Sequence, residues 1–439
     1  MAEGWAPGFR NARSADEPVA GSFIAVIERR AAGGRANPTD SATAWLRLAV
    51  AVLLSTIGGV GMWSVVVALP AIQADFGVDR GDASLPYTLT MLGFAGGGVI
   101  TGKLADRFGI TMPLVCGALA MGLGYLAVGH AATLWQVTLA YGLLIGAGCS
   151  TTFGPLMADM SHWFLRRRGI AVALAAAGNY LAGTVWPPVV QHFIATVGWR
   201  ATHSGVGLFV IAAMLPLTYF MRRRMESDHT IGAAQSAAAR QAQLPFSAAT
   251  LQVLLFIAGI ACCVAMSMPQ VHIVAYCGDL GYGAARGAEM LSLMLGLGIV
   301  SRIASGFIAD RIGGVRTLLL GSLLQGVALV LYLFFDGLAS LYVISGLFGL
   351  FQGGIVPSYA IIVREYFSPK EASTRVGLVV MATVLGMALG GWLSGAIFDV
   401  TGSYQAAFLN GLGWNLLNVS IAAWLLLRTP QRAALASSL

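Results

Sequence analysis

Long apolar stretches separated by short polar loops fill the chain from about residue 45 to residue 428. A transmembrane helix needs roughly 20 apolar residues to cross about 30 Å of hydrocarbon, and most of these stretches approach that length. They comprise the glycine-rich stretch Leu85–Ala105 together with Leu46–Leu69, Leu114–Val128, Trp135–Met157, Ile170–Ile194, Leu208–Phe220, Leu251–Tyr276, Met290–Ala309, Leu318–Phe335, Leu341–Ile362, Val376–Phe398 and Phe408–Leu427. The pattern predicts an all-α membrane protein with about twelve transmembrane helices.

The composition agrees with this pattern. Of the 439 residues, 57% are hydrophobic and only 10% are charged, and the mean hydropathy is +0.76. In soluble domains about a quarter of the residues are charged, so the low fraction here indicates that most of this chain lies in lipid. The five cysteines lie in or beside apolar stretches without metal-ligand spacing, and no phosphate-binding glycine-lysine loop is present. We therefore expect no disulfide framework, no metal site and no cofactor.

A charged turn occurs twice in the chain. Gly102-Lys103-Leu104-Ala105-Asp106-Arg107-Phe108-Gly109 returns as Gly306-Phe307-Ile308-Ala309-Asp310-Arg311-Ile312-Gly313, a separation of 204 residues. Gly198-Trp199-Arg200 and Gly402-Ser403-Tyr404 have the same separation, and Pro155 and Pro357 are 202 residues apart. Matched landmarks at one spacing indicate an internal duplication.

The duplication predicts two pseudo-symmetric six-helix bundles, at residues 45–221 and 248–428. A polar, alanine-rich linker at 222–247 separates them, and we expect disordered cytoplasmic tails at 1–44 and 429–439. Duplicated membrane bundles of this kind commonly rock about a site that lies between them.

The distribution of basic residues predicts the orientation. If both termini are cytoplasmic, 22 of the 26 lysines and arginines lie in cytoplasmic loops and tails, whereas Arg80, Arg200 and Arg286 lie outside and Arg302 lies inside a span. Positive charge is concentrated on the cytoplasmic side of membrane proteins, so we expect a multi-pass protein of the plasma membrane, or of the inner membrane of a bacterium. The basic residues are dispersed over many short loops, which argues against a nucleic-acid partner.

The repeated turn is similar to the loop signature G-x-x-x-D-R-x-G that follows the second span in the major facilitator superfamily. Within that superfamily, Ser161-His162-Trp163-Phe164, Gly198-Trp199-Arg200 and Pro269-Gln270-Val271-His272 resemble bacterial members of the monocarboxylate transporter family. The resemblance implies the major facilitator fold and transport by alternating access, with proton symport or exchange.

The chain also departs from these relatives. Eukaryotic members resembling this chain pair an arginine of the eighth span with an aspartate one helical turn earlier, where this sequence has Gly298. Related oxalate/formate antiporters use a lysine in the eleventh span, and the stretch Val376–Trp392 contains none. The resemblance therefore implies a monocarboxylate rather than a dicarboxylate, and leaves the usual proton-coupling carboxylate missing.

Arg302 is the main candidate for substrate binding. It lies eight residues before Asp310, so it is about 12 Å from the end of its span, deep in the hydrocarbon. An arginine there costs at least about 2.5 kcal/mol to insert and needs a partner or a wet cavity. We find no carboxylate at a comparable depth in another span, and a guanidinium can bind a carboxylate by two parallel hydrogen bonds. A structural role, in which Arg302 bonds backbone carbonyls, is the alternative.

A second group of candidates surrounds this prediction. His272 follows Pro269 in the seventh span, where a proline is expected to disturb the helix, and its imidazole titrates near neutral pH, which makes it the candidate for proton coupling. The remaining substrate-binding candidates are Asn179, Tyr180, Gln352, Tyr359, Tyr276 and Trp63. Each of these residues could equally serve helix packing.

The two charged turns are candidates for gating between the bundles. An aspartate at a helix end can accept backbone N–H groups and pair with arginines across an interface. The gating candidates are Gly102, Asp106, Arg107, Gly109, Gly306, Asp310, Arg311 and Gly313. Ordinary turn charges are the alternative interpretation.

The sequence bears on three classes of function. An enzyme would need a nucleophile–base pair, paired carboxylates or a metal cluster at one depth, and the sequence contains none. A transporter-like receptor would need a signalling domain larger than the two tails. We therefore expect a secondary transporter of small organic anions, most of all monocarboxylates, with protons as a possible second partner, the bilayer as solvent and a monomeric state. Export of amphipathic drugs or metabolites is the alternative.

Overall fold

The computed structural model describes residues 40–164, 167–223, 247–367 and 369–428. The described residues are almost entirely helical, as an apolar medium requires, because a helix satisfies its backbone hydrogen bonds within one segment. The first half contains α2 (Ala42–Gly58), α3 (Val60–Phe76), α4 (Arg80–Ala83), α5 (Leu85–Phe108), α6 (Thr111–Gly129), α7 (Leu134–Leu139), the π-helical segment η1 (Ala140–Gly146), α8 (Ala147–Ser150), α9 (Gly154–Trp163), α10 (Arg168–Val197) and α11 (Trp199–Tyr219). The second half contains α13 (Ala248–Asp279), α14 (Ala284–Ile312), α15 (Gly314–Phe334), α16 (Leu338–Gln352), α17 (Ile355–Tyr366), α18 (Pro369–Thr401) and α19 (Tyr404–Arg428).

Eleven segments of the described chain are long and apolar enough to cross a membrane. The first of them joins α2 and α3 into one span, Ala42–Phe76. α19 is not one of these eleven segments; it has 25 residues, packs beside α13 and α15 and contains Asn410, Asn415 and Asn418. Large apolar side chains such as Leu143 and Phe334 are about 70% exposed, as expected for surfaces that face lipid.

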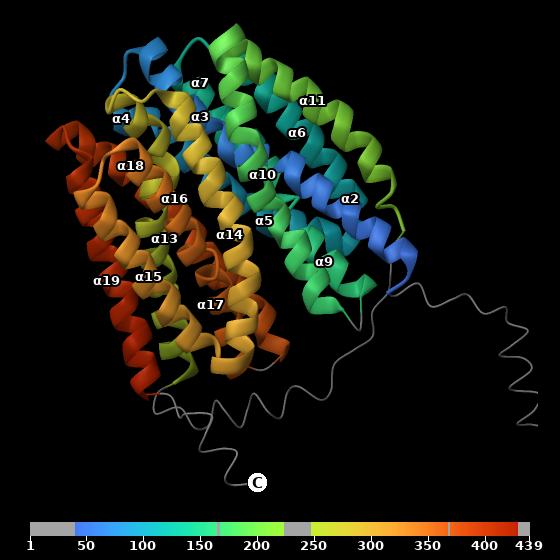
Figure 1. Ribbon diagram of the computed structural model, residues 1–439. Helices are drawn as coiled ribbons and strands as arrows, with labels where there is room; N and C mark the ends of the chain where they lie inside the picture. Colours follow the sequence, from blue (N-terminus) through green and yellow to red (C-terminus); the bar gives the residue numbers. More distant parts are fainter. Residues whose placement is uncertain (1–39, 165–166, 224–246, 368, 429–439) are drawn as a thin grey trace, which may run out of the picture.

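The helices gather into two bundles that lie side by side (Figure 1). In one bundle α6 packs on α11 and α10 packs on α2, and in the other α13 packs on α18 and α19 and α14 packs on α16. The bundles meet where α10 packs on α14 and where α5 packs on α18. The beginning of α2 and the end of α19 lie at the same end of the molecule, here called the termini end, and α4 lies at the opposite end, here called the α4 end (Figure 1).

The internal duplication is visible in the backbone. Three pairs of glycines with a left-handed φ lie 204 residues apart, namely Gly77 and Gly281, Gly109 and Gly313, and Gly198 and Gly402. Each of these glycines ends one helix, and in two of the pairs the next helix begins within two residues. A side chain would be strained at these angles, so the glycines impose the same turns in both halves.

Two spans are broken at corresponding places. The span of α7 to α9 is interrupted at residues 151–153, and the span of α16 and α17 is interrupted at Gly353 and Gly354. Pro155 and Pro357 lie in the first turn of the helix that follows each break, where a missing backbone N–H costs nothing. By contrast, α13 continues through Pro269, so the expected irregularity of the seventh span does not interrupt the helix.

The structure corrects the expected position of Arg47. The count of basic residues assigned it to a cytoplasmic loop or tail, although the expected stretch Leu46–Leu69 includes it, and in the structure it lies within α2 and is only 3% exposed. Its guanidinium donates to both oxygens of Asp159, at 2.8 and 3.0 Å, and to the carbonyls of Phe220 and Met221. A buried arginine is tolerated here because a carboxylate and the end of a helix neutralise and solvate it.

The helix bounds can be set beside the expected boundaries. α2 begins at Ala42, so residues 42–44 are helical and do not belong to a disordered tail. α13 begins at Ala248 and α19 ends at Arg428. Residues 1–39, most of the linker (224–246) and the tail 429–439 lie outside the described residues.

Candidate functional site

Arg302 lies where the two bundles meet. It belongs to α14, about 15 Å from the termini end of that helix, and its side chain is half-buried against α10 of the other bundle. Its Nη1 donates to the backbone carbonyl of Ala176 at 3.3 Å. The contact therefore joins a charged side chain of one bundle to the backbone of the other.

The ring of Tyr180 covers one face of this guanidinium. The distance from Cζ of Arg302 to the ring centroid is 4.3 Å, a cation–π contact, and Tyr180 itself is 7% exposed. Gly298, one turn before Arg302, makes room for the ring, because a Cβ at Gly298 would lie 2.4 Å from Tyr180 Cε1. The position where relatives are expected to carry an aspartate is thus occupied by an aromatic ring from the other bundle.

No carboxylate pairs with Arg302 among the residues that the structure describes. Its Nε is buried and has no hydrogen-bond partner within the same residues. A buried charge with an unused donor is unfavourable unless a counter-charge reaches it. The arrangement is therefore able to bind an anion.

Two more of the expected substrate-binding residues lie at this contact. The indole Nε1 of Trp63 donates to the carbonyl of Asn179 at 3.3 Å, and Trp63 is 3% exposed. Asn179 directly precedes Tyr180 on α10, and a Cβ at Gly183, one turn on from Asn179, would lie 2.9 Å from the Trp63 ring and 2.2 Å from Leu295 of α14. Trp63 and Asn179 therefore lie along α10 beside the contact between Tyr180 and Arg302, and we call Trp63, Asn179, Tyr180 and Arg302 the Arg302 site.

Gln352 lies at the break between α16 and α17. It is fully buried, and neither atom of its amide has a hydrogen-bond partner within the described chain. The next two residues pack directly on α14: a Cβ at Gly353 would lie 2.4 Å from the carbonyl oxygen of Gly298, and one at Gly354 would lie 2.2 Å from Ser305 Cβ. The broken helix therefore adjoins the turn of α14 that carries Arg302.

His272 does not lie near Arg302. It is fully buried about 10 Å from the α4 end of α13, whereas Arg302 is about 27 Å from the α4 end of α14. Its Nε2 is 2.8 Å from the carbonyl oxygen of Gly391, and its Nδ1 is 3.3 Å from the hydroxyl of Tyr404. These contacts place His272 between α13, α18 and α19.

Tyr276 and Tyr359 also lie apart from the Arg302 site. The ring of Tyr276 packs edge-on against Tyr404 and Phe408, with centroid distances of 5.2 and 5.7 Å. The hydroxyl of Tyr359 donates to Asn418 at 2.9 Å, in the interior of the second bundle. Both residues take part in contacts within that bundle.

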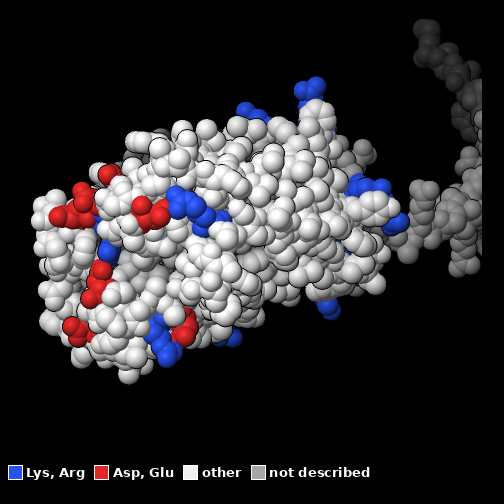
Figure 2. All heavy atoms as spheres, turned by 90° about the horizontal axis from the view of Figure 1, so that it is seen from above, with Lys and Arg blue, Asp and Glu red and all other residues white. Residues whose placement is uncertain are grey.

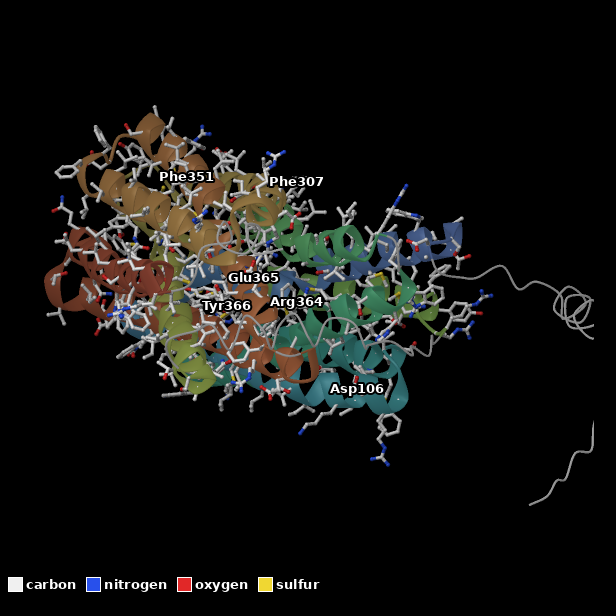
Figure 3. The ribbon with its side chains drawn as sticks, turned by 90° about the horizontal axis from the view of Figure 1, so that it is seen from below. Asp106, Phe307, Phe351, Arg364, Glu365 and Tyr366 are labelled. Carbon is white, nitrogen blue, oxygen red and sulfur yellow. The ribbon has the colours of Figure 1, made fainter. Side chains whose placement is uncertain are left out.

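The gating candidates lie at the termini end. Asp106 and Asp310 are exposed in the last turns of α5 and α14, beside Arg107 and Arg311, and Gly109 and Gly313 end these helices. Gly102 and Gly306 lie one turn earlier, and a Cβ on either would meet no atom within 4 Å. Viewed from this end, Asp106 and Glu365 lie on different bundles (Figure 3).

Sequence reasoning missed Glu365 in this region. Both of its carboxylate oxygens accept the backbone N–H of Gly314, at 3.3 and 3.4 Å, which is the N-terminus of α15. A carboxylate there is favoured by the helix dipole. The repeated turn predicted that its aspartates would accept hydrogen bonds from helix ends. Glu365 lies outside that turn, so the repeat could not predict its contact with Gly314.

A central cation between two duplicated bundles of membrane-spanning helices is an arrangement found in secondary transporters. The sequence model of the Major Facilitator Superfamily matches residues 51–340 and 290–438, and the chain belongs to this superfamily of transport proteins. Within it, the chain is 30% identical over 324 residues to Monocarboxylate transporter 13 of Bos taurus. The aligned region covers 71% of this chain and 73% of that protein.

Other relatives agree with this placement. Monocarboxylate transporter 13 of Rattus norvegicus is 29% identical over 322 residues, covering 71% of this chain and 72% of that protein. The MFS-type transporter pynF of Aspergillus niger is 24% identical over 330 residues, covering 74% of each chain. The expected superfamily and the likeness to monocarboxylate transporters are therefore confirmed. These relatives are eukaryotic, so the resemblance to bacterial members stays an expectation.

Proposed function

We propose that this protein is a secondary active transporter of small organic anions, above all monocarboxylates, that works by alternating access with proton symport or exchange. The observation that carries the proposal is the guanidinium of Arg302 at the contact between the bundles, which forms no ion pair with any residue that the structure describes. A transported carboxylate supplies the missing counter-charge when it binds and leaves it unpaired again when it departs. The names of the relatives support the same class of cargo.

The contacts of Arg302 suggest how the anion binds. Nη1 bonds Ala176, and Tyr180 covers one face of the guanidinium. The edge formed by Nε and Nη2 is then the one that offers two parallel N–H groups, and Nε has no other partner in the described structure. Asn179 and Gln352 would add amide donors, while Trp63 and Tyr180 would pack against the apolar part of a small acid.

His272 is the proposed proton-coupling residue. A carboxylate beside Arg302 is absent from the described residues, so proton coupling would use a titratable group elsewhere. His272 is such a group, and Tyr404 connects it to contacts between the bundles at the α4 end. Under this proposal the proton and the anion bind at separate places and are coupled through the movement of the bundles.

We place the termini end in the cytoplasm and the α4 end outside, on the distribution of basic residues. Figure 2, which looks onto the α4 end, supports this choice, because acidic side chains gather there over the second bundle. The membrane proposed is the plasma membrane, or the inner membrane in a bacterium, and the proposed working unit is the monomer.

Purified protein in proteoliposomes tests the proposal. We expect uptake of labelled lactate or pyruvate that is saturable and is competed by other small monocarboxylates, and a rise in thermal stability with the same acids, because a ligand that binds the folded form stabilises it. A protonophore lowers net uptake if protons are carried along, and it leaves counterflow between two pools of anion intact if the protein is an exchanger. Stabilisation by amphipathic cations and not by acids would instead favour export of drugs or metabolites, and would contradict the proposal.

Replacing Gly298 tests the role of the free guanidinium. In Gly298→Asp the new carboxylate can pair with Arg302, so we expect the affinity for a monocarboxylate at pH 7 to fall by at least about tenfold, or roughly 1.4 kcal/mol. The control is Gly298→Asn, which has the same shape, crowds Tyr180 equally and carries no charge. The difference in monocarboxylate affinity between the two variants should become smaller as the pH is lowered, because protonation of the introduced carboxyl group removes the charge that competes with the cargo. Equal affinities in both variants at pH 7 would mean that the charge of Arg302 does not bind the cargo.

A further inference from the structure

The α4 end holds a dense set of polar contacts between the bundles. The backbone N–H groups of Arg80 and Gly81 donate to the two carboxylate oxygens of Asp399, at 2.8 and 2.6 Å. The approach is close, because a Cβ at Gly395 would lie 2.9 Å from the carbonyl oxygen of Arg80. The turn at α4 is therefore fastened to α18 of the other bundle by its backbone.

The side chain of Arg80 adds to these contacts. Its guanidinium donates to both oxygens of Asp279, at 2.6 and 3.2 Å, and to the hydroxyl of Tyr404 at 2.5 Å, and it lies 4.6 Å from the centroid of the Phe398 ring. Arg80 is only 8% exposed. Asp279, Tyr404 and Phe398 belong to the second bundle, whereas Arg80 belongs to the first, where its Nε also donates to Gln73 at 2.8 Å. We call Arg80, Gly81, Asp279, Asp399 and Tyr404 the α4 latch.

The duplication shows that this pairing is not what the repeated fold itself requires. Asp279 lies 204 residues after Asp75 and corresponds to it, and Tyr404 corresponds in the same way to Arg200. In the first bundle Asp75 pairs with Arg200, an ion pair within one bundle, and Arg200 stacks on Trp199 at 4.3 Å. In the second bundle the corresponding arginine is a tyrosine, and Arg80 reaches across from the first bundle to take its place.

Arg80 is also dispensable for the local helix start. Its own counterpart 204 residues on is Ala284, which begins α14 without a charged side chain. The ion pair therefore lies within one bundle in the first half and crosses the interface in the second half. The arginine that crosses, Arg80, has no counterpart in the repeat. We infer that it functions in the contact between the bundles.

We propose that the α4 latch holds the α4 end of the molecule closed, and that its opening is the step that exposes the central site to that side of the membrane. Elsewhere in the described chain, Arg302, Thr88 and Ser292 also donate across this contact, to the backbone carbonyls of Ala176, Ala388 and Thr184. The latch joins the bundles by charge-assisted bonds, which are about twice as strong as neutral ones, so its loss shifts the balance between closed and open forms towards the open form. The proposal does not depend on which solute is carried.

The experiment measures the distance between the bundles at the α4 end. Nitroxide labels are attached at Ala132→Cys, in the loop before α7, and at Ala285→Cys, in the first turn of α14, with the exposed Cys116 replaced by serine. Both positions are exposed and neither belongs to the latch. Pulsed electron paramagnetic resonance on full-length protein in nanodiscs, without added anion, then reports the populations of closed and open forms.

In Arg80→Gln we expect the ratio of long label-to-label distances (open form) to short ones (closed form) to rise roughly tenfold over the parent protein, because the charge-assisted bonds of Arg80 are lost. The matched control is Arg200→Gln, which removes the equivalent ion pair within one bundle and should leave the distribution unchanged. Asp399→Asn approaches the latch from the other bundle and should shift the distances in the same direction as Arg80→Gln. Distances in Arg80→Gln and Asp399→Asn that match those of Arg200→Gln overturn the proposal, whether or not the protein carries monocarboxylates.

Discussion

Arg302→Ala is expected to abolish anion transport while leaving the protein folded in the membrane. Truncating one partner of a buried charged pair costs roughly 2 to 5 kcal/mol, so the affinity for a monocarboxylate should fall by at least about thirtyfold. Stability should change little, because Arg302 has no carboxylate partner among the described residues and bonds a single backbone carbonyl. The measurements are uptake into proteoliposomes, thermal stability and elution from a sizing column.

Arg302→Lys and Arg200→Ala complete this experiment. Lysine keeps the positive charge but not the planar fork of donors, so we expect residual transport between that of the parent and that of Arg302→Ala. Arg200→Ala removes an arginine that pairs with Asp75 within one bundle, and should transport at close to the parental rate. Uptake by Arg302→Ala equal to that of the parent would remove the central site from the proposed mechanism.

Gly93→Ala is expected to destabilise the first bundle strongly. A Cβ at Gly93 would lie only 1.9 Å from the carbonyl oxygen of Gly142, in the π-helical segment η1. The obstacle is backbone, so no side-chain rotation can relieve it, and the helices α5 and η1 must separate. Overpacking of this kind costs about 1 to 3 kcal/mol, and more where backbone must move. The measurement is the midpoint of thermal unfolding in detergent, together with the amount of protein recovered from membranes.

Gly96→Ala is the matched control for Gly93→Ala. Gly96 lies on the same helix one turn further on, and a Cβ there would meet no atom within 4 Å. Both substitutions favour helix formation equally, so a difference between them reports packing alone. Gly349→Ala repeats the test in the second bundle, where the Cβ would lie 2.0 Å from the carbonyl oxygen of Met294. If Gly93→Ala and Gly96→Ala had the same unfolding midpoint within error, α5 and η1 would not pack as closely as described.

The two inferences about function use different parts of the duplication. The Arg302 site and the α4 latch both depend on residues that one half carries and the other lacks, namely Arg302 and Arg80. Neither residue has a charged counterpart in the other half, since Gly98 corresponds to Arg302 and Ala284 corresponds to Arg80. The departures from the repeat are therefore where this protein's own function is to be sought.

Some features of the site followed from the sequence and others did not. Arg302, Tyr180, Asn179 and Trp63 were expected to share a site, and the structure brings them together at one contact. His272 was expected in the same region because it follows Pro269, where the helix was expected to be disturbed, but α13 continues through this proline. Its burial against Gly391 and Tyr404 depends on how α13, α18 and α19 pack.

The sequence by itself determined the helices, their approximate number, the two halves and the positions of the turns, because hydrophobic length and glycine conformations act locally along the chain. Only the tertiary structure decided which residues meet. Tyr180 fills the place beside Gly298, Asp159 neutralises Arg47, and Arg80 takes the position that Arg200 holds in the first half. These contacts join residues more than 100 positions apart, and they depend on the angles and depths at which helices pack, which no local pattern specifies.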